Sequence, residues 1–275
     1  MAYQTLIVED GEGVRTITFN RPDAGNAFDF TMTGEFAEAM WAAEADESVR
    51  AIVVTGAGKS FSTGLDLSAG ADAFGDAQHS QHNDELGVTD EGITEQYAFW
   101  RMRTPVIIAI NGTAIGAGLT LALLADIRVA AEDARLRFPF TRFNVLPDAG
   151  SSWLLPRLIG LSRAMELLLT GRWFTGAEAA EIGMVSRAVP RGEVLAVAAD
   201  IAKDIAANAA PLATGVTKEL IYGSLGEVDR AAAMTRETKL IWWAGSQPDS
   251  AEGVQAFLDR RPPKWTGSKH TALPR

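Results

Sequence analysis

The chain of 275 residues contains no cysteine, and this absence excludes disulfide bonds, thiolate metal ligands and a cysteine nucleophile. Histidine is nearly as scarce, with only His79, His82 and His270. His79 and His82 lie three residues apart in a polar stretch whose composition is typical of a solvated loop. We therefore expect no bound metal ion.

Long hydrophobic runs are also missing. The longest largely apolar stretches, such as residues 106–110 and 119–125, are far shorter than the roughly 20 residues that a membrane-spanning helix needs. The first residues lack the basic region and apolar core of a secretory signal. The sequence therefore predicts a cytoplasmic protein without a membrane partner.

Positively charged residues are fewer than negatively charged ones. The chain has 25 lysines and arginines and 35 aspartates and glutamates, which gives a net charge of −10. A nucleic-acid partner requires a basic surface and is not expected. Any polyanionic ligand would need a local group of cations. Since 47% of the residues are hydrophobic, the chain is long enough to bury a sizeable core in one large domain or two small ones.

Predicted strands and helices alternate along the first two thirds of the chain. Residues 5–9 and 14–20 are rich in β-formers around an Asp-Gly-Glu-Gly turn, which predicts a hairpin. Asp29 or Thr31 can N-cap a helix that runs to about residue 47. Further predicted elements are strands at 51–55, 106–110 and 127–130 and helices at 118–125 and from about 150. This alternation predicts an α/β fold.

Two segments depart from this alternation. Residues 68–91 are rich in Ala, Gly, Asp, His, Gln and Asn, and we expect a lid-like insertion there. From about residue 192 the pattern is helical throughout, with helices predicted at 193–207, 211–222, 227–243 and 250–260. We divide the chain into a core of residues 1–195 and a C-terminal helical region of residues 196–275.

Two glycine motifs resemble cofactor-binding loops but have the wrong spacing. Gly56-Ala57-Gly58-Lys59-Ser60 ends like a phosphate-binding loop, yet Val53 stands where that loop requires its first glycine. Gly116-Ala117-Gly118 lacks the third glycine of a dinucleotide fingerprint, since Leu121 occupies that position. Neither a nucleoside triphosphate nor NAD is expected.

Two other glycine-bearing turns, residues 62–66 and 111–118, each follow a run that reads as a buried strand. They belong to an ordered series of short motifs: Asn20-Arg21-Pro22, Asn26-Ala27, Thr55-Gly56-Ala57-Gly58, Phe61-Ser62-Thr63-Gly64-Leu65-Asp66-Leu67, Pro105-Val106-Ile107, Asn111-Gly112, Ala125-Asp126-Ile127-Arg128 and Leu154-Leu155-Pro156-Arg157. In this order and spacing, from about residue 5 to 265, the series resembles the enoyl-CoA hydratase/isomerase (crotonase) superfamily.

The resemblance implies a spiral of ββα units whose C-terminal helices form a homotrimer or a dimer of trimers. It implies an acyl-CoA thioester as substrate, and coenzyme A is then part of the substrate, so no separate cofactor is expected. The implied oxyanion-hole donors are the main-chain N–H groups of Leu65 and Ala117. Ala117 replaces the usual glycine, which is tolerable because the donor belongs to the backbone and lies at a helix start.

The resemblance also implies residues that bind the substrate. In the two turns these are Ser62, Gly64, Asp66 and Gly116, although Asp66 could serve the turn itself. Ala24 and Ala27 would offer backbone groups to the adenine. Arg260 matches a basic position that reaches the CoA of a neighbouring subunit, and its alternative is a solvated arginine at a helix end.

The two glutamates that hydrate an enoyl-CoA in this superfamily are replaced by Thr120 and Phe140. Thr120 can hydrogen-bond without acting as a general base, and Phe140 can shape the pocket. A carboxylate stands instead at Asp148, as in the similar branch of phenylacetyl-CoA isomerases, where the aspartate moves a proton near the thioester. Apolar neighbours such as Phe140, Leu146 and Trp153 would raise the pKa of Asp148 if they enclose it.

Alternatives for Asp148 stay open. Aspartate is among the best N-cap residues, and Asp148 precedes a predicted helix. In a halide-displacing branch, an aspartate at this position attacks an aromatic ring. For the whole protein, the leading hypothesis is an acyl-CoA isomerase with Asp148 as proton carrier. The others are a hydratase that uses Asp148 and Thr120 with a water, and a CoA-thioester-binding paralogue without chemistry.

Overall fold

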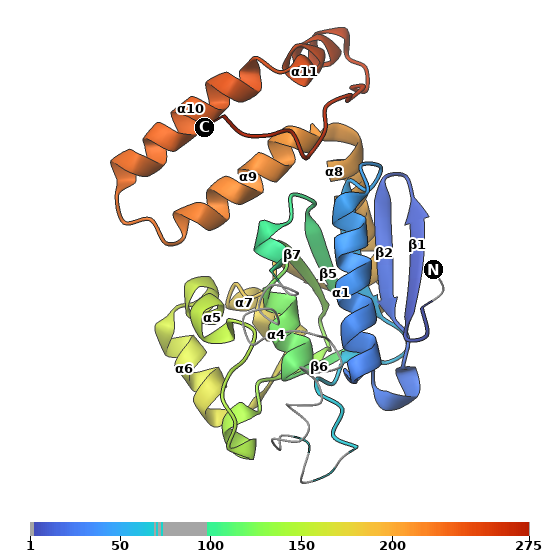
Figure 1. Cartoon of the computed structure of the whole chain (residues 1–275). Coiled ribbons are helices and arrows are strands. Elements are labelled where there is room, and N and C mark those ends of the chain that lie inside the picture. Colours follow the sequence, from blue (N-terminus) through green and yellow to red (C-terminus); the bar gives the residue numbers. More distant parts are fainter. Residues whose placement is uncertain (1–2, 69, 71–72, 74–97, 275) are drawn as a thin grey trace.

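The computed structural model describes residues 3–68, 70, 73 and 98–274 (Figure 1). Its strands are β1 (Leu6–Gly11), β2 (Val14–Phe19), β3 (Ala51–Gly56), β4 (Ser60–Ser62), β5 (Val106–Ile110), β6 (Thr113–Ile115), β7 (Ile127–Ala131), β8 (Arg135–Arg137), β9 (Trp173–Thr175) and β10 (Arg187–Val189). Its α-helices are α1 (Phe30–Ala45), α4 (Ala117–Leu123), α5 (Ser151–Ile159), α6 (Leu161–Thr170), α7 (Gly176–Glu181), α8 (Val194–Asn208), α9 (Pro211–Ser224), α10 (Arg230–Gly245) and α11 (Pro248–Asp259). The predicted α/β fold is confirmed.

A six-stranded sheet in the order β1-β2-β3-β5-β7-β10 forms the centre of the fold. The predicted hairpin is present, with β1 antiparallel to β2 in a register from Leu6 opposite Phe19 to Gly11 opposite Val14. All other neighbours in this sheet are parallel. Every residue of β3 and β5 is buried, as expected for parallel strands covered on both faces.

A second sheet contains the short strands β4, β6, β8 and β9. β4 follows β3 in the chain, β6 follows β5 and β8 follows β7, so each of these three strands of the first sheet is followed by a short strand of the second. In the second of these units the helix α4 follows at once. This repeat is the ββα spiral expected for the superfamily. The three-residue strands escaped prediction because they are too short to show an alternating pattern.

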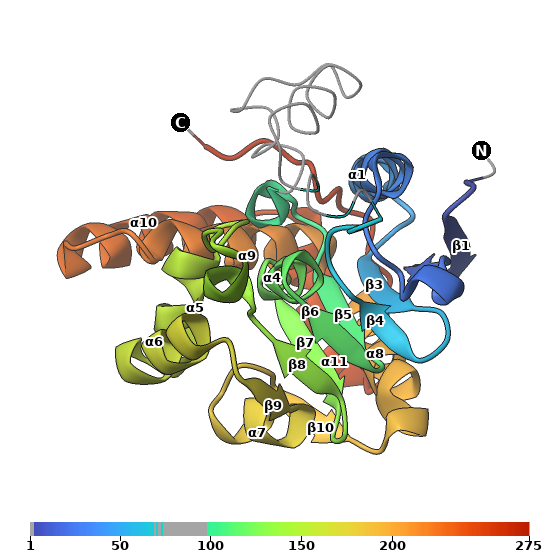
Figure 2. The ribbon, with the colours of Figure 1, turned by 90° about the horizontal axis from the view of Figure 1, so that it is seen from below.

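The helices of the core cover both faces of the six-stranded sheet. α8 packs across β2, β3, β5 and β7, while α1 packs against β1 and β2 (Figure 2). The Asp29 carboxylate caps α1 by accepting a hydrogen bond from the Met32 N–H at 2.8 Å, so Asp29 is the cap and Thr31 lies inside the helix. The Phe19 ring lies 5.1–5.4 Å from the rings of Phe28, Phe36 and Phe61 in the core under α1.

The predicted C-terminal helices are all present, and three of them, α9 to α11, extend from one end of the core (Figure 1). α8 lies on the sheet rather than with these three helices, and the predicted division at residue 195 stays a prediction. α10 has no buried residue, and its Trp242 is 77% exposed. The predicted lid, residues 68–91, and the pair His79 and His82 lie largely or wholly outside the described residues. Within the described residues, no helix is both long and apolar enough to cross a membrane.

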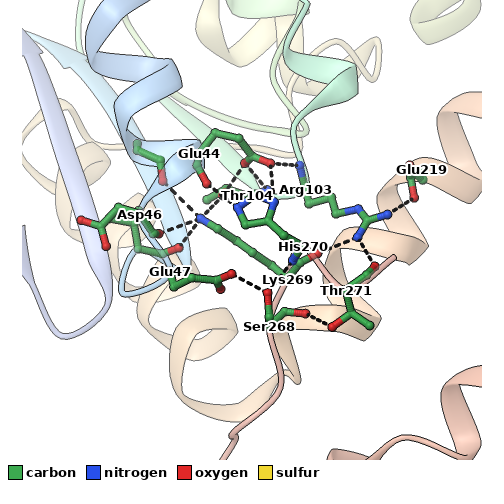
Figure 3. Close-up of polar contacts among 12 residues, drawn as sticks. Glu44, Asp46, Glu47, Arg103, Thr104, Glu219, Ser268, Lys269, His270 and Thr271 are labelled. Carbon is green, nitrogen blue, oxygen red and sulfur yellow. Dashed lines mark hydrogen bonds and ion pairs between the residues drawn. The ribbon is translucent and has the colours of Figure 1, made fainter. Parts of the chain in front are cut away.

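The chain after α11 turns back and binds the end of α1 (Figure 3). The buried Lys269 Nζ lies 2.8–3.2 Å from the carbonyl oxygens of Ala43, Asp46 and Val49 and 2.8 Å from Thr104 Oγ1. Its ammonium group therefore binds the Ala43 carbonyl in the last turn of α1 and the Asp46 and Val49 carbonyls that follow the helix. Burial lowers the pKa of Lys269. The tail thus joins the C-terminal region to the core.

Replacing Lys269 by methionine is expected to lower the free energy of unfolding by about 3 kcal/mol, because several buried acceptors lose their donor. Denaturant unfolding followed by circular dichroism measures the loss. Lys203→Met is the control, since Lys203 is half exposed and pairs with Glu12 on the surface. Its unfolding midpoint should stay near that of the wild type. Equal midpoints for the two variants would contradict the anchoring role of Lys269.

Candidate active site

A cavity of about 660 Å³ opens where α1, α4, α5 and α9 meet. Its described lining consists of Phe28, Thr33, Leu65, Trp100, Ala117, Thr120, Leu121, Leu124, Asp148, Ala149, Gly150, Trp153, Leu154 and Tyr222. Five of the predicted site residues are among them: Leu65, Ala117, Thr120, Asp148 and Trp153. Most of the other lining residues are apolar, as is usual for a small-molecule site.

The two glycine-bearing turns pack directly against each other at the cavity wall. Gly64 has a φ of +88°, and a Cβ there would lie 2.6 Å from the Ile115 carbonyl oxygen and 3.2 Å from the Ala117 nitrogen. A Cβ on Gly118 would lie 2.5 Å from the Ser62 carbonyl oxygen. Only glycine fits at either position, and the close approach brings Leu65 and Ala117 to the same wall.

The main-chain N–H groups of Leu65 and Ala117 are available to a ligand. Phe28 pairs with the first turn through the Gly64 carbonyl and the Asp66 N–H, which leaves the Leu65 N–H out of that pairing. Ala117 is the first residue of α4, where N–H groups have no acceptor within the helix. In the described part of the chain neither N–H donates to another backbone group. Two such donors at one cavity wall can bind a carbonyl oxygen and stabilise negative charge on it.

Asp148 presents a carboxylate to the cavity from the loop that precedes α5. Its Oδ1 accepts a hydrogen bond from Thr120 Oγ1 at 2.6 Å. Desolvation raises the pKa of Asp148 above the ordinary aspartate value, and the hydrogen bond from Thr120 opposes part of that rise. Asp148 is solvent-exposed on the side that faces the open cavity. The protein on its other sides displaces much of the water that would otherwise surround the carboxylate. A carboxylate with a raised pKa is suited to accept a proton.

The N-cap interpretation of Asp148 is wrong. α5 begins at Ser151, its N-cap residue is Gly150 with a φ of +71°, and no side chain caps the helix. Asp148 contributes only its main-chain carbonyl, which accepts from the Ser151 N–H at 2.8 Å. Its side chain is therefore free to face the cavity.

The predicted apolar enclosure of Asp148 is only partly correct. Trp153 lines the cavity, and Arg157 stacks on its ring at 3.9 Å. Leu146 is 84% exposed and is not part of the described lining. Phe140 lies in the hydrophobic core at the start of a 3-10 helix, η4 (Phe140–Phe143), and is not part of that lining either. Its predicted role in shaping the pocket is therefore not supported.

Three predicted substrate-binding residues of the first turn, Ser62, Gly64 and Asp66, are not part of the described lining of the cavity. Ser62 is buried, with its Oγ donating to the Asn26 carbonyl at 2.8 Å and accepting from the Gly64 N–H at 3.2 Å. The Asp66 carboxylate accepts from the Ser68 N–H and pairs with Arg21 at 3.0 Å. These interactions hold the first turn around Leu65, and the predicted contacts of Ser62, Gly64 and Asp66 with a substrate stay predictions.

Gly116, Ala24, Ala27 and Arg260 also lie outside the described lining. Gly116 is the N-cap residue of α4 and donates its N–H to the Arg137 carbonyl at 3.1 Å. The N–H groups of Ala24 and Ala27 both donate within their own loop, and their carbonyls accept from the Ala27 N–H and from Arg21 Nη1 respectively, so the predicted contact with an adenine stays a prediction. Arg260 is exposed at the end of α11, and its contact with the CoA of a neighbouring subunit stays a prediction.

Several lining residues were not predicted. Leu121 and Leu124 could have been found, because with Ala117 and Thr120 they follow the i, i+3, i+4, i+7 spacing of one helix face. Tyr222 could not, since it comes from α9, about a hundred residues further along the chain. Its hydroxyl donates to Asp126 Oδ1 at 3.0 Å, and Lys218 pairs with Asp126 at 2.8 Å. This contact holds α9 at the cavity.

Comparisons with known proteins identify sequences similar to this chain. The sequence model of the family described as enoyl-CoA hydratase/isomerase matches residues 9–268. A probable enoyl-CoA hydratase from Rhodobacter capsulatus is 36% identical over 273 residues, which cover 97% of this chain and 100% of the relative. The 1,2-epoxyphenylacetyl-CoA isomerase from Escherichia coli strain K12 is 36% identical over 263 residues, covering 93% and 96%.

Solved structures are similar as well. The crystal structure of a probable enoyl-CoA hydratase/isomerase from Mycobacterium abscessus has a TM-score of 0.86 and 38% sequence identity, and the match covers 96% of this chain and 99% of that one. Sequence, fold and the paired N–H donors therefore lead to one conclusion. The chain belongs to the enoyl-CoA hydratase/isomerase family and has the crotonase fold.

Proposed function

We propose that this protein is an acyl-CoA isomerase that moves the double bond of an enoyl-CoA by carrying a proton from C2 to C4. The observation that supports the proposal most strongly is the carboxylate of Asp148. It is the only carboxylate in the described lining of the cavity, and it shares that lining with Leu65 and Ala117. A single proton carrier beside two N–H donors is sufficient for isomerisation.

The proposed reaction begins with a 3-enoyl-CoA whose thioester oxygen accepts hydrogen bonds from the Leu65 and Ala117 N–H groups. The Asp148 carboxylate removes a proton from C2, and the electrons of the C–H bond form a dienolate with its negative charge on the thioester oxygen. Asp148, now protonated, returns the proton to C4. The double bond then lies between C2 and C3, and Asp148 is again a carboxylate.

Addition of water by the usual route needs a second carboxylate to hold the nucleophile. At the two positions where the superfamily carries glutamate, this chain has Thr120, whose hydroxyl is hydrogen-bonded to Asp148, and Phe140, which is buried in the core. Neither side chain can take up a proton from water near neutral pH. These residues support isomerisation over hydration.

Hydration remains the second candidate, because the Rhodobacter capsulatus relative is named a probable enoyl-CoA hydratase. In this alternative, Asp148 and Thr120 would position the attacking water. As the assembly we propose a homotrimer or a dimer of trimers.

The two candidates make opposite predictions about the conjugated thioester absorbance. With a 3-enoyl-CoA, the purified protein is expected to produce a rise, since the product is conjugated. With a 2-enoyl-CoA, the absorbance should stay nearly constant. A rapid fall with the 2-enoyl-CoA would favour the hydratase. Binding of acyl-CoAs without any change on a panel of chain lengths would favour a paralogue without chemistry.

A further inference from the structure

The hydroxyl of Thr120 has two hydrogen-bond acceptors within reach in a fully buried position. Its Oγ1 lies 2.6 Å from Oδ1 of Asp148 and 3.2 Å from the carbonyl oxygen of Ala117. A hydroxyl carries one proton and two lone pairs, so it donates to one of these oxygens at a time. Its choice of acceptor depends on the charge of Asp148.

Both contacts follow from the position of Thr120 on α4. Ala117 precedes it by three residues, and at this spacing a threonine hydroxyl reaches the carbonyl of the preceding turn. Asp148 precedes α5, which packs against α4 and so brings the carboxylate to the same hydroxyl. The hydroxyl therefore lies between a helix carbonyl and the proposed proton carrier.

The two protonation states of Asp148 require different arrangements. An ionised carboxylate can only accept, so the Thr120 hydroxyl must donate to it, and 2.6 Å is a typical length for such a charge-assisted bond. A protonated Asp148 can itself donate to Thr120 Oγ1. The threonine proton then has the Ala117 carbonyl as its acceptor. Both groups stay satisfied in each state.

We propose that Thr120 is a positioning residue whose hydroxyl donates to the Asp148 carboxylate and turns to the Ala117 carbonyl whenever Asp148 is protonated. The inference rests on the proposed function, because it concerns the residue that carries the proton. The switch holds the carboxyl in one place through both proton transfers. It also stabilises the ionised form, which is the form that acts as a base.

Besides Asp148, the described residues place Tyr222 and Arg157 near the cavity. Tyr222, on α9, is the other titratable residue in the described lining. Its hydroxyl donates to Asp126, and burial raises its pKa, so it stays neutral. Arg157, on α5, stacks on Trp153 at 3.9 Å. The acidic limb of the pH dependence is therefore assigned to Asp148.

The test replaces Thr120 by valine, which has nearly the same shape without the hydroxyl. Loss of a donor to the ionised carboxylate makes ionisation less favourable, so the pKa of Asp148 rises. The acidic limb of kcat/KM for 3-enoyl-CoA should move to higher pH by about one to two pH units. Thr120→Ser keeps a hydroxyl, and its limb should stay at the wild-type position.

A Thr120→Val limb at the wild-type pH, with a rate lowered equally at every pH, would overturn the proposal. If circular dichroism shows that the valine variant is unfolded, Thr120→Ala is measured in the same way. A second readout does not need turnover: the infrared carbonyl band of protonated Asp148, identified by its loss in Asp148→Asn, is titrated with pH. An upward shift in Thr120→Val supports the switch even if wild type isomerises nothing, whereas an unchanged titration overturns it.

Discussion

Asp148→Asn is expected to lower the rate of 3-enoyl-CoA isomerisation by about 10²- to 10⁴-fold, the usual contribution of a general acid–base residue. Asparagine keeps the size of the side chain and an oxygen that can still accept from Thr120 Oγ1, the present partner of Asp148 at 2.6 Å. It cannot take up a proton from C2. The loss should therefore appear in kcat, with little change in the binding of the thioester.

The variant should also be folded and at least as stable as the wild type at any pH where Asp148 of the wild type is ionised. Desolvation raises the pKa of Asp148, so the ionised carboxylate destabilises the native state, and a neutral amide removes that cost. Asp133→Asn is a matched control, because Asp133 forms an exposed ion pair with Arg191 away from the cavity. Full isomerase activity in Asp148→Asn would show that another group carries the proton.

Gly64→Ala is expected to lower kcat by about 10²- to 10³-fold, the cost of losing one oxyanion donor. The new Cβ would lie 2.6 Å from the Ile115 carbonyl oxygen, so one of the two turns must move. Either movement displaces the Leu65 N–H from the Ala117 N–H. The positive φ of +88° adds about 1 to 3 kcal/mol of backbone strain to the loss of stability. Steady-state kinetics and denaturant unfolding measure the two effects separately.

Gly183→Ala separates backbone strain from the clash. Gly183 has a similar φ of +83°, but the nearest atom to an added Cβ is the Leu158 carbonyl oxygen at 3.7 Å, an ordinary contact. This variant should lose some stability and keep its activity. If Gly64→Ala retained wild-type kcat, the turns would not be positioning an oxyanion hole.

Much of the fold could be predicted because long, regular elements leave clear patterns. The buried strands β3 and β5 read as apolar runs, and the Asp29 cap and α1 followed from side-chain chemistry. The strands of the second sheet have three residues each, too few for a periodic signal. They pair with one another in the order β4-β6-β8-β9, and this tertiary pairing is not visible in any local sequence pattern.

Only some residues of the candidate site could likewise be predicted from the sequence. Leu65, Ala117, Thr120, Asp148 and Trp153 were predicted and lie together at the cavity. Phe140 was assigned by its position in a motif, but the 3-10 turn that begins there directs it into the core. Tyr222 and Trp100 reach the cavity only through packing of distant segments. A motif can identify the backbone donors, whereas the cavity wall requires the assembled fold.

The central claim, proton transfer between two carbons of a thioester, is tested most directly by the product formed from 3-enoyl-CoA in D₂O. Nuclear magnetic resonance and mass spectrometry identify that product. The account predicts 2-enoyl-CoA, with no water added and with any deuterium taken up from the solvent found at C4. A 3-hydroxyacyl-CoA as the first product, with oxygen from the solvent at C3, would contradict it.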